Sequence, residues 1–198
     1  IINATKNEDV GSLTGVPSWM MVVLQRLLAE TGKNYLDELW PNLEVFFHGG
    51  ISFKPYQENY NSITQKKLNY FELYNASEGF FAIQDQNDSD ELLLMLDYGI
   101  FYEFIPMDTF GTLNQHVIRL NQVVLNKNYA LVITTNSGLW RYLIGDTIRF
   151  TSLSPYRIKV SGRTKHHINV FGEELMVENT DNAIAKTCKA FNCEVVDY

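Results

Sequence analysis

"YALVITTNSGLWRYLIGDTIRF", residues 129–150, is the stretch that indicates the fold most clearly. Two runs of β-branched and aromatic residues flank the turn-forming cluster Asn136-Ser137-Gly138, a pattern typical of a β-hairpin. The second run contains Gly145-Asp146 inside an apolar strand. Because burying a carboxylate without donors is costly, either a bulge exposes Asp146 or its two oxygens accept hydrogen bonds from a ligand. The two hydroxyls of a ribose suit such a bidentate acceptor.

Similar runs extend this hairpin into a strand-rich region from about residue 68 to 160. They are separated by turn clusters, which predicts a series of antiparallel hairpins. The runs are "KLNYFELY" (67–74), "GFFAIQD" (79–85), "ELLLML" (91–96), "IFYEFI" (100–105) and "YRIKVSGR" (156–163). One polar segment, "TLNQHVIRLNQVVL" (112–125), has spaced apolar positions and is interpreted as a candidate helix.

The two ends of the chain add helices and one more strand. Pro17 begins an amphipathic stretch that ends at Thr31-Gly32, which predicts a helix because proline fixes the first turn and glycine permits a left-handed stop. "LEVFFHGG" (43–50) is typical of a buried strand closed by two glycines. Residues 177–191 place their apolar side chains on one face of a second helix.

Composition limits the classes of function. The net charge is −7, with no cluster of Lys and Arg, so a nucleic-acid backbone is excluded as the main partner. No apolar run is long enough to span a membrane. The most apolar helix candidate, 19–28, is interrupted by Gln25 and Arg26. The two cysteines, Cys188 and Cys193, lack the C-x-x-C spacing of a redox pair, so we expect reduced thiols and a cytoplasmic location.

The short stretch "YNASEG" (74–79) separates two of the apolar runs. Asn, Ser and Gly are common turn formers, so a plain β-turn is one interpretation. The other is a nucleotide site, in which Tyr74 offers a flat face to a base, Ser77 donates to a phosphate oxygen and Glu78 holds Mg²⁺. The residues alone leave both open.

Three further motifs are candidates for ligand sites. Arg163 follows a glycine at the end of a predicted strand, where it is either a surface arginine or a donor to ribose or phosphate. Neighbouring residues of a strand point to opposite faces, so the pair His166-His167 does not predict a zinc site. "GSLTG" (11–15) lacks the G-K-[ST] ending of a phosphate loop and is interpreted as a plain loop.

The order of these motifs resembles a known superfamily. Tyr-x-x-Ser-Glu (74–78), then Tyr-x-x-Gly-Asp (142–146), then Gly-Arg (162–163) is similar to the motif order of adenylate-forming, luciferase-like enzymes. Within that superfamily the chain most resembles the auxin-responsive acyl-acid amido synthetases of plants and their bacterial relatives. The stretches that carry this resemblance are "GVPSWM", "LWPNLEVFFHGG", "YNASEGFFAIQ", "FYEFIP", "YALVITTNSGLWRYLIGDTIRF" and "SGRTKHHINVFGEEL".

The resemblance implies an α/β fold with α+β character. Residues 1–160 would be the strand-rich part of a large adenylate-forming domain, and residues 161–198 the hinge and the beginning of a small C-terminal α/β domain. The implied catalytic residues are Ser77 at the α-phosphate, Glu78 at Mg²⁺ and Lys165 at the pivot of the small domain. The implied nucleotide-binding residues are His48, Gly49, Gly50, Tyr74, Asn75, Ala76, Asp146 and Arg163.

The implied activity is an ATP-dependent ligation. A carboxylic acid would be activated to an acyl-AMP, and an amino acid amine would then displace AMP. The family's triphosphate loop and most of its small domain have no counterpart here, and both termini look cut, so we expect a fragment that is inactive alone. Three alternatives remain open: a thiol acceptor, a non-catalytic nucleotide-binding module, and a β-rich interaction domain. The acid, the amine and the oligomeric state are not indicated.

Overall fold

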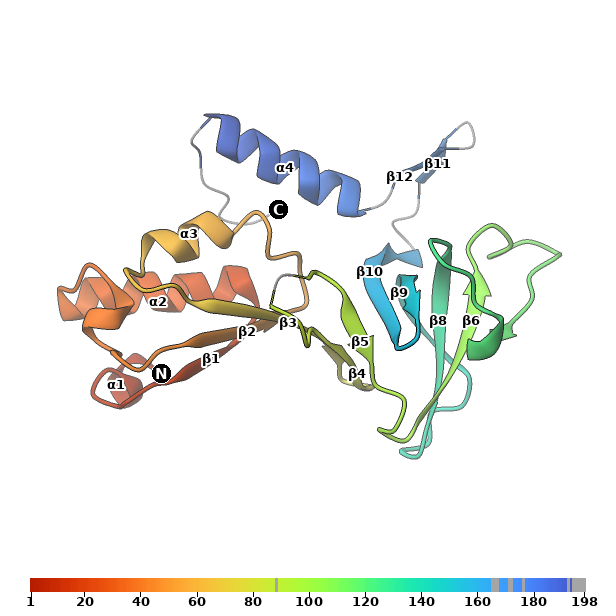
Figure 1. Cartoon of the computed structure of the whole chain (residues 1–198), viewed down its shortest axis with the longest axis horizontal. Helices are drawn as coiled ribbons and strands as arrows, with labels where there is room; N and C mark the ends of the chain where they lie inside the picture. Colours follow the sequence, from red (N-terminus) through yellow and green to blue (C-terminus); the bar gives the residue numbers. More distant parts are fainter. Residues whose placement is uncertain (88, 165–167, 171–172, 176, 192, 194–198) are drawn as a thin grey trace. The chain divides into compact units, whose positions relative to one another are not determined.

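A computed structural model of the chain describes residues 1–87, 89–164, 168–170, 173–175, 177–191 and 193. The described residues form two compact units, which we call unit 1 (Ile1–Leu73 and the part from Asp181) and unit 2 (Tyr74–Thr180). Ten strands follow the hydrogen-bonded order β1-β2-β3-β4-β5-β10-β9-β8-β6-β7, and β11 pairs with β12 in a separate ribbon. The elements are labelled in Figure 1.

Unit 1 is built from short parallel strands and helices. Its elements are α1 (Ile2–Thr5), β1 (Ser12–Gly15), α2 (Pro17–Thr31), η1 (Leu36–Glu38), β2 (Val45–Gly49), α3 (Gln57–Ser62), most of β3 (Asn69–Ala76) and most of α4 (Val177–Phe191). β2 lies between β1 and β3 and pairs with both in parallel. Since parallel strands need crossover connections, α2 and α3 supply them on one face of the strands (Figure 1).

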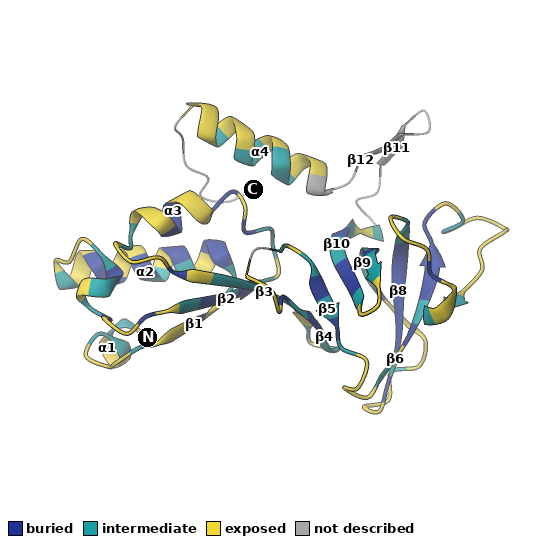
Figure 2. Cartoon of the chain, in the orientation of Figure 1, coloured by how far each residue is buried: buried dark blue, intermediate teal, exposed yellow. Residues whose placement is uncertain are grey.

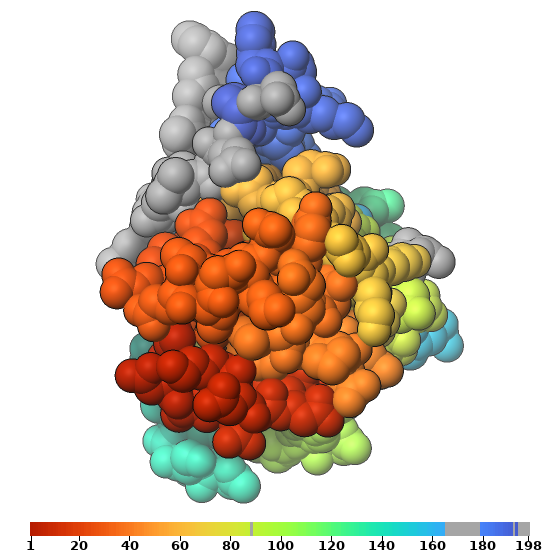
Figure 3. All heavy atoms as spheres, turned by 90° about the vertical axis from the view of Figure 1, so that its left-hand side faces the viewer, coloured from red at the N-terminus to blue at the C-terminus, as the bar shows by residue number. Residues whose placement is uncertain are grey.

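Aromatic side chains dominate the core of unit 1. The ring of Phe46 stacks on Tyr60 at 4.8 Å between centroids, and the Tyr60 hydroxyl donates to the Pro17 carbonyl at 2.8 Å, which ties α3 to the start of α2. The Trp40 ring nitrogen donates to the Thr5 carbonyl at 3.1 Å. The N-terminal residues, red in Figure 3, accordingly lie against the orange residues that follow them.

Unit 2 is built on an antiparallel sheet in which β10 lies between β5 and β9, and β8 lies between β9 and β6. After the end of β3 it contains β4 (Gly79–Ile83), β5 (Leu92–Leu94), β6 (Ile100–Pro106), β7 (Ile118–Arg119), η2 (Leu120–Gln122), β8 (Asn128–Thr135), β9 (Tyr142–Leu153), β10 (Tyr156–Arg163), β11 (Ile168–Val170) and β12 (Glu173–Leu175). The register is antiparallel for the pairs β4/β5, β5/β10, β10/β9, β9/β8, β8/β6, β6/β7 and β11/β12. β8 is buried along most of its length (Figure 2).

The predicted fold class and most predicted elements are confirmed. The helix expected from Pro17 to Thr31 has these bounds, and Gly32 ends it with φ +66°. The tail helix spans Val177–Phe191, and the hairpin around Asn136-Ser137-Gly138 is the β8–β9 connection. The predicted antiparallel hairpins are present at β4–β5, β8–β9 and β9–β10. The consecutive strands β5 and β6 do not pair with each other, because β5 pairs with β10 and β6 with β8.

The prediction of a helix at 112–125 is wrong. Ile118 pairs with Phe104 at the sheet edge, and the Gln122 side chain accepts from the Arg119 backbone at 2.9 Å to hold the short turn η2. Only Val123 of this segment is fully buried, whereas the exposed fractions are 106% for Leu113 and 59% for Val124. The spaced apolar residues therefore share no buried helical face.

The interpretation of "GSLTG" as a plain loop is also wrong. Ser12–Gly15 forms β1 and pairs in parallel with β2, from Ser12 opposite Val45 to Gly15 opposite His48. The strand has one buried residue, Leu13, so its four positions carry too little alternation to be recognised from sequence. Tertiary pairing decides its conformation.

Within the described residues, no helix has the length and apolar character needed to cross a membrane. In the same part of the chain, no three His, Cys, Asp or Glu side chains gather as a metal-ligand set.

Candidate functional site

The stretch 74–79 is a tight turn between β3 and β4. Ser77 and Glu78 form its tip, Ser77 exposed and Glu78 half-buried. Among the described residues, no side chain bonds to either of them. A Cβ at Gly79 would lie 2.9 Å from the Ile100 Cδ1 atom, so a larger residue there would displace the end of that side chain. The turn thus presents a hydroxyl and a carboxylate to which no described side chain is hydrogen-bonded.

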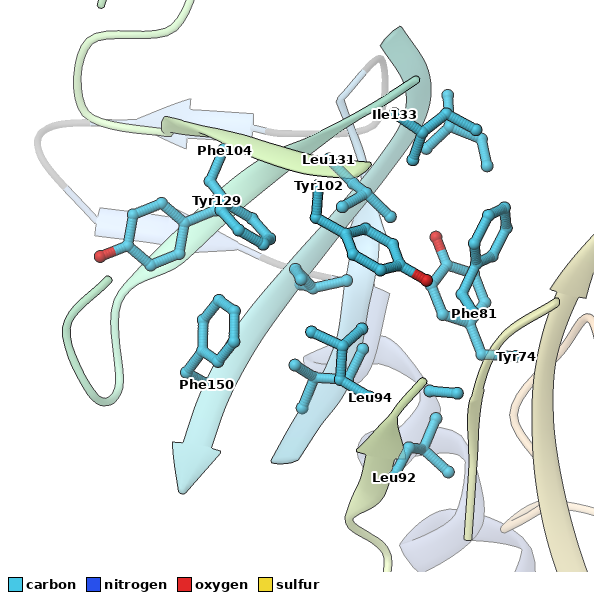
Figure 4. Packing of buried hydrophobic residues seen from close by; sticks show 14 of the residues in the cluster. Tyr74, Phe81, Leu92, Leu94, Tyr102, Phe104, Tyr129, Leu131, Ile133 and Phe150 are labelled. Carbon is cyan, nitrogen blue, oxygen red and sulfur yellow. The ribbon is translucent and has the colours of Figure 1, made fainter. Parts of the chain in front are cut away.

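Tyr74 precedes this turn and points into unit 2. Its side chain is 7% exposed, and its ring lies 5.0 Å from that of Phe81, as Figure 4 shows within the surrounding core. The hydroxyl donates to Asp146 Oδ2 at 2.9 Å, across 72 residues of sequence. The first and second predicted motifs are therefore in direct contact.

A bulge in β9 positions Asp146. Thr147 pairs with Ala130 and Leu143 with Val132, so three residues of β9 lie opposite the single residue Leu131 of β8. Gly145, at the middle of the bulge, has φ +92°, a conformation that favours glycine. The Thr164 hydroxyl donates to the Gly145 carbonyl at 3.2 Å and so holds the bulge from the far end of β10.

The carboxylate of Asp146 has a second donor from β10. Arg163 is its register partner on that strand, and the Arg163 Nε atom lies 3.1 Å from Asp146 Oδ1. The Asp146 side chain is 16% exposed and that of Arg163 is 60% exposed. Each carboxylate oxygen has one described side-chain donor and a further acceptor position, because an ionised carboxylate has about four lone-pair sites.

The surroundings keep Tyr74 protonated. Burial raises the pKa of Tyr74 well above its usual value, and the charge of Asp146 and the hydrogen bond to it raise the pKa further, against a lowering effect of Arg163. The phenol therefore remains a donor throughout the physiological range. Asp146 is held by one neutral donor and one cation, a suitable environment for a carboxylate that accepts from a ligand.

Three predicted nucleotide-binding residues belong to unit 1. The His48 ring stacks on Phe53 at 4.2 Å between centroids and is 4% exposed. Burial lowers the pKa of His48 to about 4, and its Nδ1 atom has no hydrogen-bond partner in the described structure. Gly49 ends β2, and Gly50 follows it with φ +86°.

The other predicted residues are placed as follows. Asn75 is exposed, and Ala76 packs at the edge of the unit 2 core. Lys165 lies outside the described residues, as do His166 and His167. Sequence reasoning missed Thr164 and the buried pair Ser161–Thr147, whose hydroxyls are 3.1 Å apart. The available signal was position alone, because these residues flank Arg163 and Asp146 in the chain.

Comparison with protein families identifies two consecutive regions. The model of the GH3 family N-terminal domain matches residues 1–68, and that of the GH3 family central domain matches residues 93–163. The second match contains Asp146 and Arg163.

Curated relatives match more than half of the chain. The putative indole-3-acetic acid-amido synthetase GH3.9 of Arabidopsis thaliana is 30% identical over 135 residues, which are 59% of this chain and 23% of the relative. Indole-3-acetic acid-amido synthetase GH3.8 of Oryza sativa subsp. indica is 30% identical over 127 residues, 59% of this chain and 20% of the relative. The chain thus spans about a fifth to a quarter of the length of these relatives.

Solved structures share the fold. The acyl acid amido synthetase AtGH3.15, in complex with 2,4-DB, superposes with a TM-score of 0.73 at 14% identity over 97% of this chain and 43% of that one. An open conformation of 2-hydroxyisobutyryl-CoA ligase, in complex with 2-HIB-AMP and CoA, gives 0.59 at 17% identity over 88% of this chain and 41% of the ligase. The expected α/β fold of adenylate-forming enzymes is therefore present. The two domain matches and the curated relatives show that the chain belongs to the GH3 family.

Proposed function

We propose that this chain contributes the nucleotide-holding part of an ATP-dependent acyl-acid amido synthetase. The observation that carries the proposal is the contact of Tyr74 and Arg163 with the partly exposed carboxylate of Asp146 in a member of the GH3 family. The names of the matched relatives, which are amido synthetases of indole-3-acetic acid, support the reaction class.

Asp146 is suited to hold the ribose of ATP. Its two oxygens are fixed by Tyr74 and Arg163, so the plane of the carboxylate is set before a ligand arrives. The acceptor positions that remain can take two adjacent hydroxyls, and fixed acceptors lose little entropy on binding. Arg163, largely exposed, can also donate to a phosphate.

The turn at 77–78 is suited to the phosphates. The exposed hydroxyl of Ser77 can donate to an α-phosphate oxygen. Glu78 is one carboxylate without a described side-chain partner, and Mg²⁺ sites commonly combine one or two carboxylates with substrate phosphates. Glu78 would thus hold Mg²⁺, which supplies charge neutralisation at the phosphate when bound.

We assign the base contact chiefly to backbone and turn residues. With 7% of Tyr74 exposed, its ring offers little area for stacking, and its hydroxyl positions Asp146 instead. Asn75 and Ala76 would border the adenine. At 48–50, the His48 ring is buried in unit 1, so a contribution there would come from the backbone of Gly49 and Gly50.

The proposed reaction takes its class from the names of the matched relatives, and the placement of these residues supports its first step. The acid carboxylate attacks the α-phosphate, pyrophosphate leaves, and an acyl-adenylate forms. An amino acid amine then displaces AMP to give the amide. In the first step Ser77 holds the phosphate oxygens and Asp146 fixes the ribose, so the protein aligns the reacting atoms with contacts remote from them.

The remaining predictions stay proposals for the complete enzyme. Residues 1–160 would belong to its large domain and residues 161–198 to the hinge and small domain, with Lys165 at the pivot. Carboxylic and amino acids would be its substrates, and the cytoplasm its location. A thiol acceptor in place of the amine would leave the roles of Asp146, Ser77 and Glu78 unchanged.

The test is acid-dependent exchange of labelled pyrophosphate into ATP by the complete protein that contains this chain. We expect exchange, and a loss of at least about tenfold in Glu78→Ala, because metal-held charge on the phosphate is removed. Glu30→Ala, at an exposed carboxylate paired with Arg26, is the matched control. Exchange that is absent, or undiminished in Glu78→Ala, would contradict the proposal.

A further inference from the structure

The two cysteines of the chain meet at the end of α4. The helix ends at Phe191, and the backbone N–H of Cys193 donates to the Cys188 carbonyl at 3.1 Å. A bond from the second residue beyond a helix back to its last turn is typical of a Schellman cap. In a continuing helix, residues five apart would point in directions about 140° apart. The cap therefore brings together two side chains that helical spacing alone would separate.

The backbone bond brings residues 188 and 193 together, and their thiols differ in access. Burial raises the pKa of Cys188, and a hydrogen bond from the Cys193 thiol and the charge of that thiol raise it further. Cys193 is exposed, whereas Cys188 is half-buried. The pair thus consists of an accessible thiol and a less exposed thiol that the helix cap brings near it, and both are free cysteines.

We propose that Cys188 and Cys193 form a reversible oxidation site, closed by an intrachain disulfide when a peroxide reaches the exposed Cys193 thiol. The peroxide oxidises the Cys193 thiolate to a sulfenic acid and is reduced to water. The Cys188 thiolate then attacks the Cys193 sulfur, the S–O bond breaks, and a second water leaves as the disulfide forms. Two thiol hydrogens and one peroxide yield one disulfide and two waters.

The geometry favours closure within the chain over attack by another molecule. The backbone bond between residues 188 and 193 already fixes the ends of the ring that the disulfide would close, so little further chain entropy is lost. Reduction by a small thiol would reopen it. The same helix is bonded to unit 1 through Lys54 Nζ and Asn182 Oδ1 at 3.3 Å, so a covalent cap would fix the end of an anchored helix.

The experiment uses the 198-residue chain, whose only thiols are these two. The chain is treated with hydrogen peroxide, alkylated, and analysed by mass spectrometry with and without prior reduction. We expect a monomer that has lost two hydrogens and resists alkylation until dithiothreitol is added. The equilibrium with glutathione disulfide should favour the intrachain bond about tenfold more in the folded chain than in guanidinium, because the cap is lost on unfolding.

Two variants test whether the helix cap, and not short separation in sequence, favours the disulfide. Cys193→Ser should take up glutathione or form disulfide-linked dimers instead of closing internally. In Cys193→Ser combined with Lys186→Cys, the two thiols are closer in sequence but lie on different faces of α4, so folding should not enhance their pairing.

Defined outcomes would overturn the proposal. One is a folded chain in which peroxide produces only sulfinic acid or intermolecular disulfides. Another is an intrachain disulfide formed equally well in guanidinium, or equally well by the pair at 186 and 188. Circular dichroism of the reduced variants establishes that each is folded before it is oxidised.

Discussion

Units 1 and 2 each hold an ionisable side chain against an aromatic residue, His48 beside Phe53 and Asp146 beside Tyr74, in contrasting environments. His48 in unit 1 is stacked on Phe53, is almost fully buried and has an Nδ1 atom without a described partner. Asp146 in unit 2 is partly exposed and is bonded by Tyr74 and Arg163. Burial keeps His48 uncharged, whereas two donors orient the carboxylate of Asp146.

This difference distinguishes a residue that packs in the core from a residue that can bind a ligand. A desolvated group without donors can fill space, but it has nothing to offer a ligand. A carboxylate that is held in one orientation and has unused hydrogen-bond acceptor positions can bind a ligand. A large pKa change therefore marks His48 as a core residue, while the geometry around Asp146 marks a site.

The largest expected effect is the pH dependence that His48 gives to folding. Its pKa falls from 6.5 to about 4 in the folded state. Between these two pH values the His48 imidazole is protonated in the unfolded chain but neutral in the folded chain. The stability that the neutral His48 contributes is therefore lost as pH falls from 6.5 toward 4. At ~1.4 kcal/mol per pH unit, the loss is about 3 kcal/mol.

Urea unfolding at pH 7 and pH 4.5 measures this contribution. His48→Phe preserves a ring against Phe53 and should reduce the difference in unfolding free energy between the two pH values. Carboxylates titrate equally in both proteins, so the comparison isolates the histidine. Identical pH dependence in the two proteins would show that His48 is not a desolvated core residue.

Asp146→Asn should cause the next largest effect. The amide keeps the shape of the carboxylate but replaces one acceptor with a donor, which opposes the ribose hydroxyl and the Arg163 guanidinium. We expect pyrophosphate exchange by the complete protein to fall about a hundredfold, or ~2.7 kcal/mol. Asp108→Asn, at an exposed carboxylate paired with Lys127, is the matched control. Equal activity of the two variants would remove Asp146 from the site.

Gly145→Ala tests the bulge that presents Asp146. Because φ is +92° there, an alanine should cost about 1–2 kcal/mol of unfolding free energy and shift the carboxylate. Gly11→Ala is the control, since a Cβ at Gly11 would make only an ordinary 3.5 Å contact. Thermal or urea unfolding of both variants provides the comparison, and an unchanged Gly145→Ala protein would contradict the strained bulge.

The smallest stability effect should come from Arg163→Gln. The guanidinium is 60% exposed, and pairs of this kind contribute less than about 1 kcal/mol to folding. We expect nucleotide affinity to fall while the unfolding free energy hardly changes. A large loss of stability with unchanged affinity would make Arg163 a structural residue instead.

Much of this contrast could be predicted from sequence. Alternation and turn clusters indicated the strands of unit 2, and Gly145-Asp146 within an apolar strand indicated a bulge or a ligand. The order of the three motifs predicted that Tyr74 and Asp146 would serve one site, and their hydroxyl and carboxylate are 2.9 Å apart. Local chemistry was informative wherever an unusual residue interrupted a regular pattern.

What could not be predicted depends on tertiary partners. The strand β1 is too short to show alternation and exists because β2 pairs with it. The segment 112–125 has helical spacing but lacks a surface that would bury one face. The stacking of His48 on Phe53 and the bond from Thr164 to the Gly145 carbonyl join residues whose contact no spacing rule predicts.

Titration of nucleotides with and without ribose hydroxyls tests the central claim that Asp146 holds the ribose. AMP and 2′,3′-dideoxy-AMP would be added to the 198-residue chain, with affinity measured by calorimetry and the Asp146 signals followed by NMR. We predict that AMP shifts the Asp146 signals and binds about tenfold to a hundredfold more tightly than the dideoxy analogue. Equal affinities, or AMP binding that leaves Asp146 unperturbed, would contradict it.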